Sequence, residues 1–299
     1  MPQGLGVQLG LGGGRSATPS GAPAGSSWVD EKSVVFDGSD DYVSTGEAVD
    51  TLWSGSFTIS LWYKTPTTFP TAASWGVVMD FIGNDMVTSK GYIEFRHNTP
   101  AGDGTPTTDP SKPELYFSVA ATGSGNYNTY AAWPNSSDDY LAVNTWYHLC
   151  WTANRPEAGT TTSKLYINGD DITLTSTSPW LSTIHNSGWT ASNNTQIGAR
   201  NVVGATPPAE LFLEGHLDEL AFFDSALTSG QVTNIYKGEE SGGSGGTNGT
   251  PGDLDTFDPG NWWRMGDGDT FPTLTDHGED GNDGTMTNMT SGDIVAVTP

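Results

Sequence analysis

The chain has 299 residues and a formal net charge of −24, from 35 Asp and Glu against 11 Lys and Arg. Contacts to nucleic-acid phosphates or to an anionic membrane surface require clustered basic side chains. The few basic residues are spread along the chain, so neither partner is expected. A single cysteine, Cys150, excludes an intrachain disulfide.

Apolar side chains are sufficient for a packed core, because the chain carries 11 Trp, 11 Phe and 10 Tyr. No stretch reaches the roughly 18 consecutive apolar residues of a membrane-spanning helix. The first residues also lack the basic start and apolar run of a secretory signal peptide. We therefore expect neither membrane insertion nor a secretory signal.

Residues 1–32 are expected to form a Gly-rich N-terminal arm. Residues 1–27 are mainly Gly, Ser, Ala and Pro, which cannot bury enough apolar surface to fold alone. Four apolar residues in this arm alternate as one face of a strand would: Leu5, Val7, Leu9 and Leu11. Two interpretations are open, a disordered tail and an arm that becomes ordered against a partner.

Residues 33–240 show short alternating runs separated by Gly, Pro, Asn, Asp and Ser, which is typical of an all-β sandwich. The clearest strand is FTISLWYK at 57–64. Its alternation places on one face Phe57, Ile59, Leu61 and Tyr63. Further strands are predicted at 34–36, 76–82, 92–96, 114–119, 145–153, 164–168, 172–175, 195–198 and 211–223. Asn168 and Gly169 predict a type I′ hairpin turn.

One short helix is predicted after Thr228, which begins the capping box T-S-G-Q with Gln231. Leu227 and Val232 occupy the positions of a hydrophobic staple, and Gly238 is a natural stop. We expect this helix to close the sandwich.

The chain beyond the helix divides by composition. Residues 241–252 are rich in Gly and Ser and are expected to form a flexible linker. Residues 253–299 hold Trp262 and Trp263 but are too few for an independent core. This segment is therefore expected to pack on the domain before it.

Six segments carry a resemblance to a known family, in chain order: SVVFDGSDDYV (33–43), FTISLWYKT (57–65), NTWYHLCWT (144–152), KLYINGD (164–170), TQIGAR (195–200) and EGHLDELAFFDSALTSGQVTNIYKG (214–238). They resemble the successive motifs of a laminin G-like jelly roll in the concanavalin A-like lectin/glucanase superfamily. The resemblance implies an all-β jelly-roll sandwich with one short closing helix, an extended N-terminal arm and a C-terminal segment packed on the sandwich.

A seventh segment, NWWRMGDGDTFPTLTDHGEDGNDGTMTN (261–288), resembles the segment that precedes the FDG strand in many such domains, yet here it follows the last helix. Either a second domain begins and is truncated, or the module is circularly permuted and the tail completes the same sandwich. The second interpretation is favoured, because it leaves no sheet edge unpaired. This arrangement with a Gly-rich start is similar to virion proteins of marine bacteriophages.

Enzyme activity is not predicted. Glycosidic hydrolysis needs two positioned carboxylates, which the glucanase branch of the superfamily places as E-x-D-x-x-E. In EGHLDE (214–219), Glu214 and Asp218 share a strand face, while Glu219 is expected on the other. The five His show no H-E-x-x-H spacing, and Cys150 is expected to be a small buried hydrophobe.

Calcium is the ion that the sequence favours. Asp37, Asp40 and Asp41 cluster in a Gly-containing turn, and calcium prefers several oxygen ligands. The resemblance implies that Asp218, on the last strand, comes near this turn, as in calcium-binding members of the superfamily. The alternative is an ordinary Asp-Gly turn with solvated carboxylates.

Glycan binding is predicted from aromatic residues in two segments expected as long loops, 124–144 and 178–194. Lectin sites place aromatic faces against sugar rings and hold hydroxyls with polar groups. The candidate residues are Tyr127, Tyr130, Trp133, Trp180 and Trp189. The alternative is that these aromatics attach the loops to the sandwich or to a neighbouring subunit.

The sequence thus favours a non-enzymatic bacteriophage virion protein, made in the host cytoplasm and attached to capsid or tail through its N-terminal arm. We expect it to form a homo-oligomer and to display a lectin-like domain toward a cell-surface glycan. Two alternatives are a free or cell-surface carbohydrate-binding module and a glycosidase-related enzyme with an unrecognised site.

Overall fold

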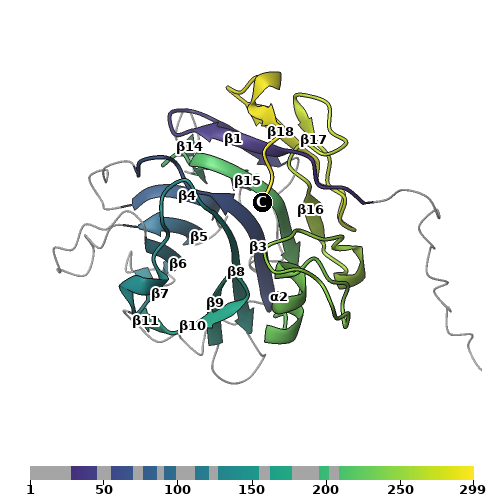
Figure 1. Cartoon of the computed structure of the whole chain (residues 1–299). Coiled ribbons are helices and arrows are strands. Elements are labelled where there is room, and N and C mark those ends of the chain that lie inside the picture. The colour runs from purple at the N-terminus through teal and green to yellow at the C-terminus, as the bar shows by residue number, and fades with distance from the viewer. Residues whose placement is uncertain are drawn as a thin grey trace, which may run out of the picture.

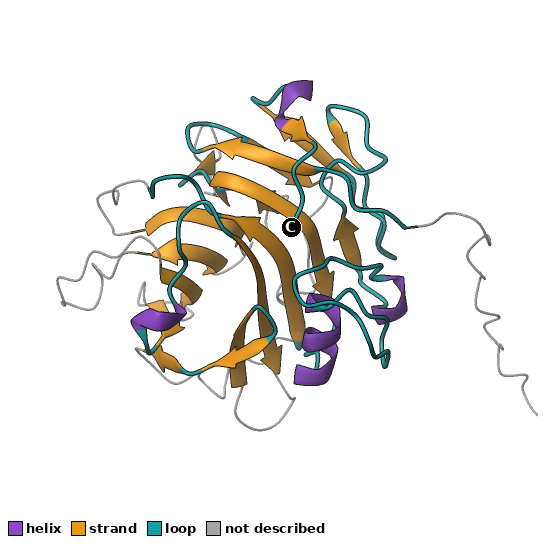
Figure 2. Ribbon diagram, in the orientation of Figure 1, coloured by secondary structure: helices purple, strands orange, loops and turns teal. Residues whose placement is uncertain are grey.

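The computed structural model describes residues 28–45, 55–69, 77–85, 91–98, 112–120, 127–154, 162–176, 195–201 and 209–299. These residues form two antiparallel β-sheets that face each other as a sandwich, with one α-helix among them (Figures 1 and 2). The all-β fold class predicted from the sequence is confirmed. Within the described residues, no helix is long and apolar enough to cross a membrane.

The first sheet has the strand order β10-β9-β8-β3-β15-β1-β19. An eighth strand, β16, also pairs with β15. Its strands are β1 (Ser33–Asp37), β3 (Phe57–Lys64), β8 (Trp146–Asn154), β9 (Thr162–Ile167), β10 (Asp170–Ile172), β15 (Glu214–Phe223), β16 (Asn261–Trp263) and β19 (Ile294–Val295). The Asn168 and Gly169 turn joins β9 to β10. Both residues have positive φ, 53° and 82°, so the predicted hairpin is confirmed.

The second sheet has the strand order β11-β7-β6-β5-β4-β12-β2-β18-β17. Its strands are β2 (Tyr42–Thr45), β4 (Val77–Asp85), β5 (Gly91–Asn98), β6 (Lys112–Ala120), β7 (Tyr127–Pro134), β11 (Leu174–Ser176), β12 (Gln196–Ile197), β17 (Thr273–Leu274) and β18 (Gly284–Thr287). A separate pair consists of β13 (Arg200–Asn201) and β14 (Ala209–Glu210). Because β7 pairs with β6 and β11, the expectation of one long loop at 124–144 is wrong.

The core lies between the sheets, and β3 shows why it forms. The alternating apolar residues of β3 are fully buried there, as predicted: Phe57, Ile59, Leu61 and Tyr63. The opposite face of β3 is buried too, at Thr58, Ser60 and Trp62. A second apolar cluster covers this outer face of the first sheet and includes residues of the helix and of the C-terminal segment.

Helix α2 (Ser229–Tyr236) begins with the predicted capping box. The Gln231 amide N–H donates to the Thr228 hydroxyl at 3.3 Å, and the Thr228 amide N–H donates to Gln231 Oε1 at 2.9 Å. Val232 and Ile235 are buried in the outer cluster together with Cys150. The helix therefore closes one face of the sandwich, as expected.

The described residues also include three short 3-10 turns, η1 (Ser137–Asp139), η2 (Asp255–Phe257) and η3 (Ser291–Asp293). The segment expected as a flexible linker is tied down by hydrogen bonds. The Gly249 amide donates to the carbonyl of Tyr236 at 3.1 Å, and the Ser241 amide donates to the Thr256 hydroxyl at 2.8 Å. Its glycines serve turns that fold the chain back across the end of α2.

The C-terminal segment, residues 253–299, contributes strands to both sheets (Figure 1). In the first sheet β16 pairs with β15 and β19 pairs with β1, while in the second sheet β18 pairs with β2. Trp263 is fully buried between the sheets and meets Phe222 edge-on, with ring centroids 5.7 Å apart. Trp262 is buried in the outer cluster. The predicted packing of this segment on the sandwich is confirmed, whereas the arm residues 1–27 lie outside the described residues.

Candidate functional site

The turn between β1 and β2 joins the two sheets at the rim of the sandwich, and it carries the predicted acidic cluster. One carboxylate oxygen from each of Asp37, Asp40 and Asp41 lies within 4.8 Å of the others. Hydrogen bonds of the turn hold two of these groups. Asp41 Oδ2 accepts from the Asp37 amide at 3.0 Å, and Asp37 Oδ1 accepts from the Ser39 amide at 2.8 Å. Burial is the main cause that raises the pKa of Asp41, to about 6, and repulsion from the Asp37 carboxylate also raises it. Calcium at this turn stays a prediction.

Asp218 does not join this turn, which corrects the expectation taken from the family resemblance. In the β1–β15 register, Asp37 lies opposite Glu214 and Val34 lies opposite Leu217. Asp218 is therefore four residues further along β15, about 13 Å at the usual rise per strand residue. Its carboxylate instead faces Asp30 and Glu219, on the outer side of the first sheet.

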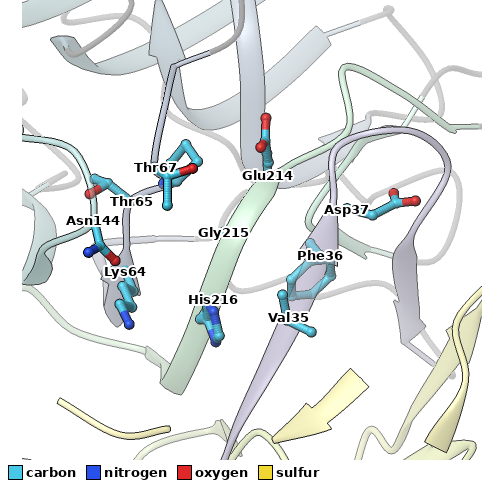
Figure 3. Close-up of a pocket in the computed structure, with 11 residues that line it drawn as sticks. Val35, Phe36, Asp37, Lys64, Thr65, Thr67, Asn144, Glu214, Gly215 and His216 are labelled. Atoms are coloured by element: carbon cyan, nitrogen blue, oxygen red, sulfur yellow. The ribbon is translucent and has the colours of Figure 1, made fainter. Parts of the chain in front are cut away.

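A pocket of about 240 Å³ opens where β1, β3 and β15 lie side by side, close to the acidic turn (Figure 3). Its lining residues are Val35, Phe36, Asp37, Lys64, Thr65, Pro66, Thr67, Asn144, Glu214, Gly215 and His216. Figure 3 shows Lys64 and His216 at one end of the pocket, with Glu214 and Asp37 nearer the turn. The volume is just below the range of about 300–1,000 Å³ that is usual for drug-sized ligands. It suits one small polar ligand or the end of a larger one.

Strand register brings the residues of this pocket together. His216 of β15 lies opposite both Val35 of β1 and Lys64 of β3, so the three side chains form a row across the sheet. Gly215 allows the close approach, because a Cβ at this position would lie 2.4 Å from the Lys64 carbonyl oxygen. Trp146 of β8 extends the row, and its ring meets that of His216 edge-on at 6.0 Å.

The protonation of His216 follows from its contacts. Burial is the main cause that lowers the pKa of His216 to about 4, and the positive charge of Lys64 also lowers it. The ring is therefore neutral at pH 7. Ser33 donates its hydroxyl proton to the carbonyl of Val297 and therefore accepts from His216 Nδ1, 3.3 Å away. The Nε2 atom of His216 is then a hydrogen-bond acceptor.

Opposite charges share this pocket. Lys64 and the amide of Asn144 supply donors, while Glu214, Asp37 and His216 supply acceptors. Burial is the main cause that raises the pKa of Glu214, and repulsion from the neighbouring Asp37 carboxylate also raises it. Donors and acceptors arranged around an apolar wall can recognise a polyhydroxylated ligand. Lys64, Asn144 and His216 were not predicted from the sequence, because only the folding of distant segments brings them together.

The aromatic residues predicted to bind glycan belong to β7 or lie outside the described residues. Tyr127, Tyr130 and Trp133 belong to β7, near the opposite edge of the second sheet from β2, and their side chains lie outside the described part of the structure. Trp180 and Trp189 also lie outside the described residues. Their role in glycan binding stays a prediction.

Cys150 is fully buried, and burial raises the pKa of its thiol, which removes it as a nucleophile. This confirms the expectation of a small buried hydrophobe.

Comparisons with known proteins place this geometry in a family. A family model described as the concanavalin A-like lectin/glucanases superfamily matches residues 37–233, and no curated protein matches the chain. The chain is similar to a heptameric SAP-like pentraxin from Limulus polyphemus at 14% identity and a TM-score of 0.40, covering 70% of this chain and 83% of that one. It is also similar to a putative carbohydrate binding protein from Bacteroides ovatus at 19% identity and a TM-score of 0.49. That match covers 89% of this chain and 60% of the other.

Proposed function

The chain belongs to the concanavalin A-like lectin/glucanases superfamily, and we propose that it is a non-enzymatic protein that binds carbohydrate in the pocket between β1, β3 and β15. The observation that carries the proposal is the row of Lys64, His216 and Val35, flanked by Asn144 and Glu214. It offers hydrogen-bond donors, acceptors and an apolar contact to one small polar ligand. These are the groups that hold sugar hydroxyls.

Binding to a glycan array, followed by calorimetry on the best ligand, tests the pocket. Lys64→Ala removes a charged donor and is expected to weaken binding about tenfold, as does the loss of a hydrogen bond to a charged group. Lys164→Ala is the matched control, because Lys164 lies on β9 of the same sheet, is exposed and pairs with Asp171. Unchanged affinity in both Lys64→Ala and Asn144→Ala would contradict the pocket as the binding site.

A second candidate function is hydrolysis of a glycosidic bond, favoured by one observation. Asp37 and Glu214 lie directly opposite each other in the β1–β15 pair and both line the pocket. Two carboxylates in one site are what such hydrolysis needs. Release of reducing ends from the bound glycan, abolished in Glu214→Gln with binding retained, would replace the non-enzymatic proposal. Its absence in the wild-type protein supports simple binding.

We further propose that the carbohydrate-binding protein is a component of a bacteriophage virion, attached to capsid or tail through the N-terminal arm and assembled as a homo-oligomer. The support is the Gly-rich start with its alternating Leu and Val, together with the order of segments in the chain. Mass spectrometry of purified particles tests the location. A protein found only outside particles would favour a free or cell-surface carbohydrate-binding module.

A further inference from the structure

A second pocket, here called the edge pocket, lies where the start of β1 meets the C-terminal segment (Figure 1). Its volume is about 410 Å³, within the range of about 300–1,000 Å³ that is usual for small-molecule sites. The lining residues are Lys32, Asp269, Thr270, Phe271, Ser291 and Ile294. None of them lines the pocket between β1, β3 and β15, so the two pockets share no residue.

The two pockets open on different sides of β1. Val34 and Phe36 point into the core between the sheets. Because side chains alternate along a strand, Lys32 lies on the same side as Val34, whereas Val35, in the first pocket, lies on the other. Ile294 of β19 lies opposite Val34 and packs against the core. The edge pocket is therefore an opening at the rim of the core, beside β1 and β19.

A tight turn forms the wall of the edge pocket that faces β19. Asp269 Oδ2 accepts from the Gly266 amide at 3.0 Å, and Asp269 Oδ1 accepts from the Thr275 amide at 2.8 Å. Gly266 has a φ of 115°, and a Cβ at this position would lie 2.6 Å from Ile294 Cγ2. Glycine thus allows the turn to approach the strand. A wall held in this way lowers the cost of ordering the site when a ligand binds.

Polar groups at the opening are left available by the fold. Lys32 is half-buried, and it forms no salt bridge or side-chain hydrogen bond with any described residue. The hydroxyls of Thr270 and Ser291 are exposed and likewise have no hydrogen-bond partner in the described part of the chain. Each carboxylate oxygen of Asp269 accepts one amide and keeps a second lone pair. The edge pocket therefore offers both donors and acceptors.

Phe271 supplies an aromatic surface among these polar groups. The ring is partly buried, packs against the core and lines the pocket, and Ile294 extends the apolar surface. A pyranose ring has an apolar C–H face and a rim of hydroxyls. An aromatic ring surrounded by donors and acceptors matches both features.

The charges of the lining residues narrow the class of ligand. Lys32 and Asp269 carry opposite charges, so the lining residues have no net charge at neutral pH. A phosphate or another anion would be attracted by the ammonium group and repelled by the carboxylate. A neutral ligand with adjacent hydroxyls uses both groups, because one hydroxyl accepts from Lys32 while another donates to Asp269.

We propose that the edge pocket binds one neutral pyranose ring of a glycan, as a second carbohydrate site. The ring packs on Phe271, and its hydroxyls bond to Lys32 and Asp269. The hydroxyls of Thr270 and Ser291 complete the contacts. This inference extends the proposed carbohydrate binding, but it depends on different residues, so either site can fail without the other. Two sites on one chain would hold a polysaccharide at two points and so increase its avidity.

The test uses the full chain labelled with 4-fluorophenylalanine and observed by fluorine NMR. The variant Phe271→Leu identifies the signal of Phe271 among the 11 phenylalanines. The labelled protein is titrated with the methyl glycosides of glucose, galactose and mannose. We expect at least one of these probes to shift the Phe271 signal in a saturable way. The same titration should be unchanged in Lys64→Ala, because Lys64 lines only the first pocket.

Variants of the edge pocket should weaken this titration. Lys32→Ala removes a charged donor and is expected to weaken binding about tenfold, and Thr270→Val, which removes one hydroxyl, about fivefold. Lys164→Ala is the matched control, because Lys164 is exposed and pairs with Asp171. Equal affinity in the wild type, Lys32→Ala and Thr270→Val would overturn the proposal.

Three further results would overturn it. The first is the absence of a saturable Phe271 shift with every probe. The second is loss of the shift in Lys64→Ala, which would place the sugar in the first pocket instead. The third is tighter binding of methyl glucuronoside than of every neutral probe, which would contradict a neutral ligand. The first pocket is judged separately, by calorimetry on Lys64→Ala.

Discussion

His148 shows how a buried side chain couples this fold to pH. The ring is fully buried against Trp62 and Tyr236, with centroids 5.3 and 6.1 Å away. Its Nε2 lies 2.8 Å from the Ser60 hydroxyl, and its Nδ1 has no partner among the described residues. Burial lowers the pKa of His148 to about 3. The ring is therefore a neutral packing group and not a catalytic base at neutral pH.

Acid should destabilise the protein through this residue. An unfolded His titrates near pH 6.5, so between about pH 6.5 and pH 3 the unfolded chain binds a proton that folded His148 does not. The free energy of unfolding then falls with decreasing pH, by at most about 1.4 kcal/mol per pH unit from this group. His148→Gln should lose less stability between pH 7 and pH 4.5 in urea unfolding, although it is less stable at pH 7. His277→Gln, at an exposed position, is the control. Equal pH dependence in His148→Gln and wild type would contradict this origin.

The alternation of side chains along a strand gave a wrong prediction for two residues of β15, Asp218 and Glu219. Alternation predicts Asp218 and Glu219 on opposite faces of β15, but a β-bulge places both on the outer side. The positive φ of Glu219 has no local signal, since glutamate is not a residue that favours it. The clustering of Asp37, Asp40 and Asp41 was predictable, because a short turn keeps near neighbours together.

At the scale of one element, helix α2 offers a direct test of its cap. Thr228→Ala removes the hydroxyl that accepts from the Gln231 amide. Loss of such a cap typically costs about 1 kcal/mol, so the free energy of unfolding should decrease by about that amount in urea denaturation. Thr228→Ser keeps the hydroxyl and should remain close to the wild type. Equal destabilisation in both variants would mean that the methyl group, and not the cap, matters.

Elements with local signals were predictable, and their partners were not. The strand β3, the hairpin at Asn168 and the capped helix each follow from a few adjacent residues. In contrast, β7 was expected to be part of a loop, because its polar and aromatic residues form a strand only when β6 and β11 pair with it. The pocket was harder still to predict from the sequence, because Val35, Lys64 and His216 come from three strands far apart in the chain.

At the scale of the whole molecule, the two sheets depend on the end of the chain. Residues 253–299 pair with β15, β1 and β2, and so protect edges in both sheets. They also place Trp263 in the core together with Leu274 and Met286. An unpaired edge invites association with other chains.

Ending the chain at residue 252 should therefore prevent cooperative folding or cause aggregation. The truncation exposes the β2 edge and removes the buried surfaces of Trp262 and Trp263, and replacing a single buried Trp by Ala already costs about 3–5 kcal/mol. Trp263→Ala in the full chain separates lost burial from lost strands. It should lower the melting temperature while leaving the protein folded and soluble, whereas the truncated chain should aggregate or fail to unfold cooperatively. Size-exclusion chromatography and circular dichroism during heating distinguish the two results. A soluble truncated fragment that melts at the wild-type temperature would instead mean that residues 253–299 are an addition to a sandwich that is already complete without them.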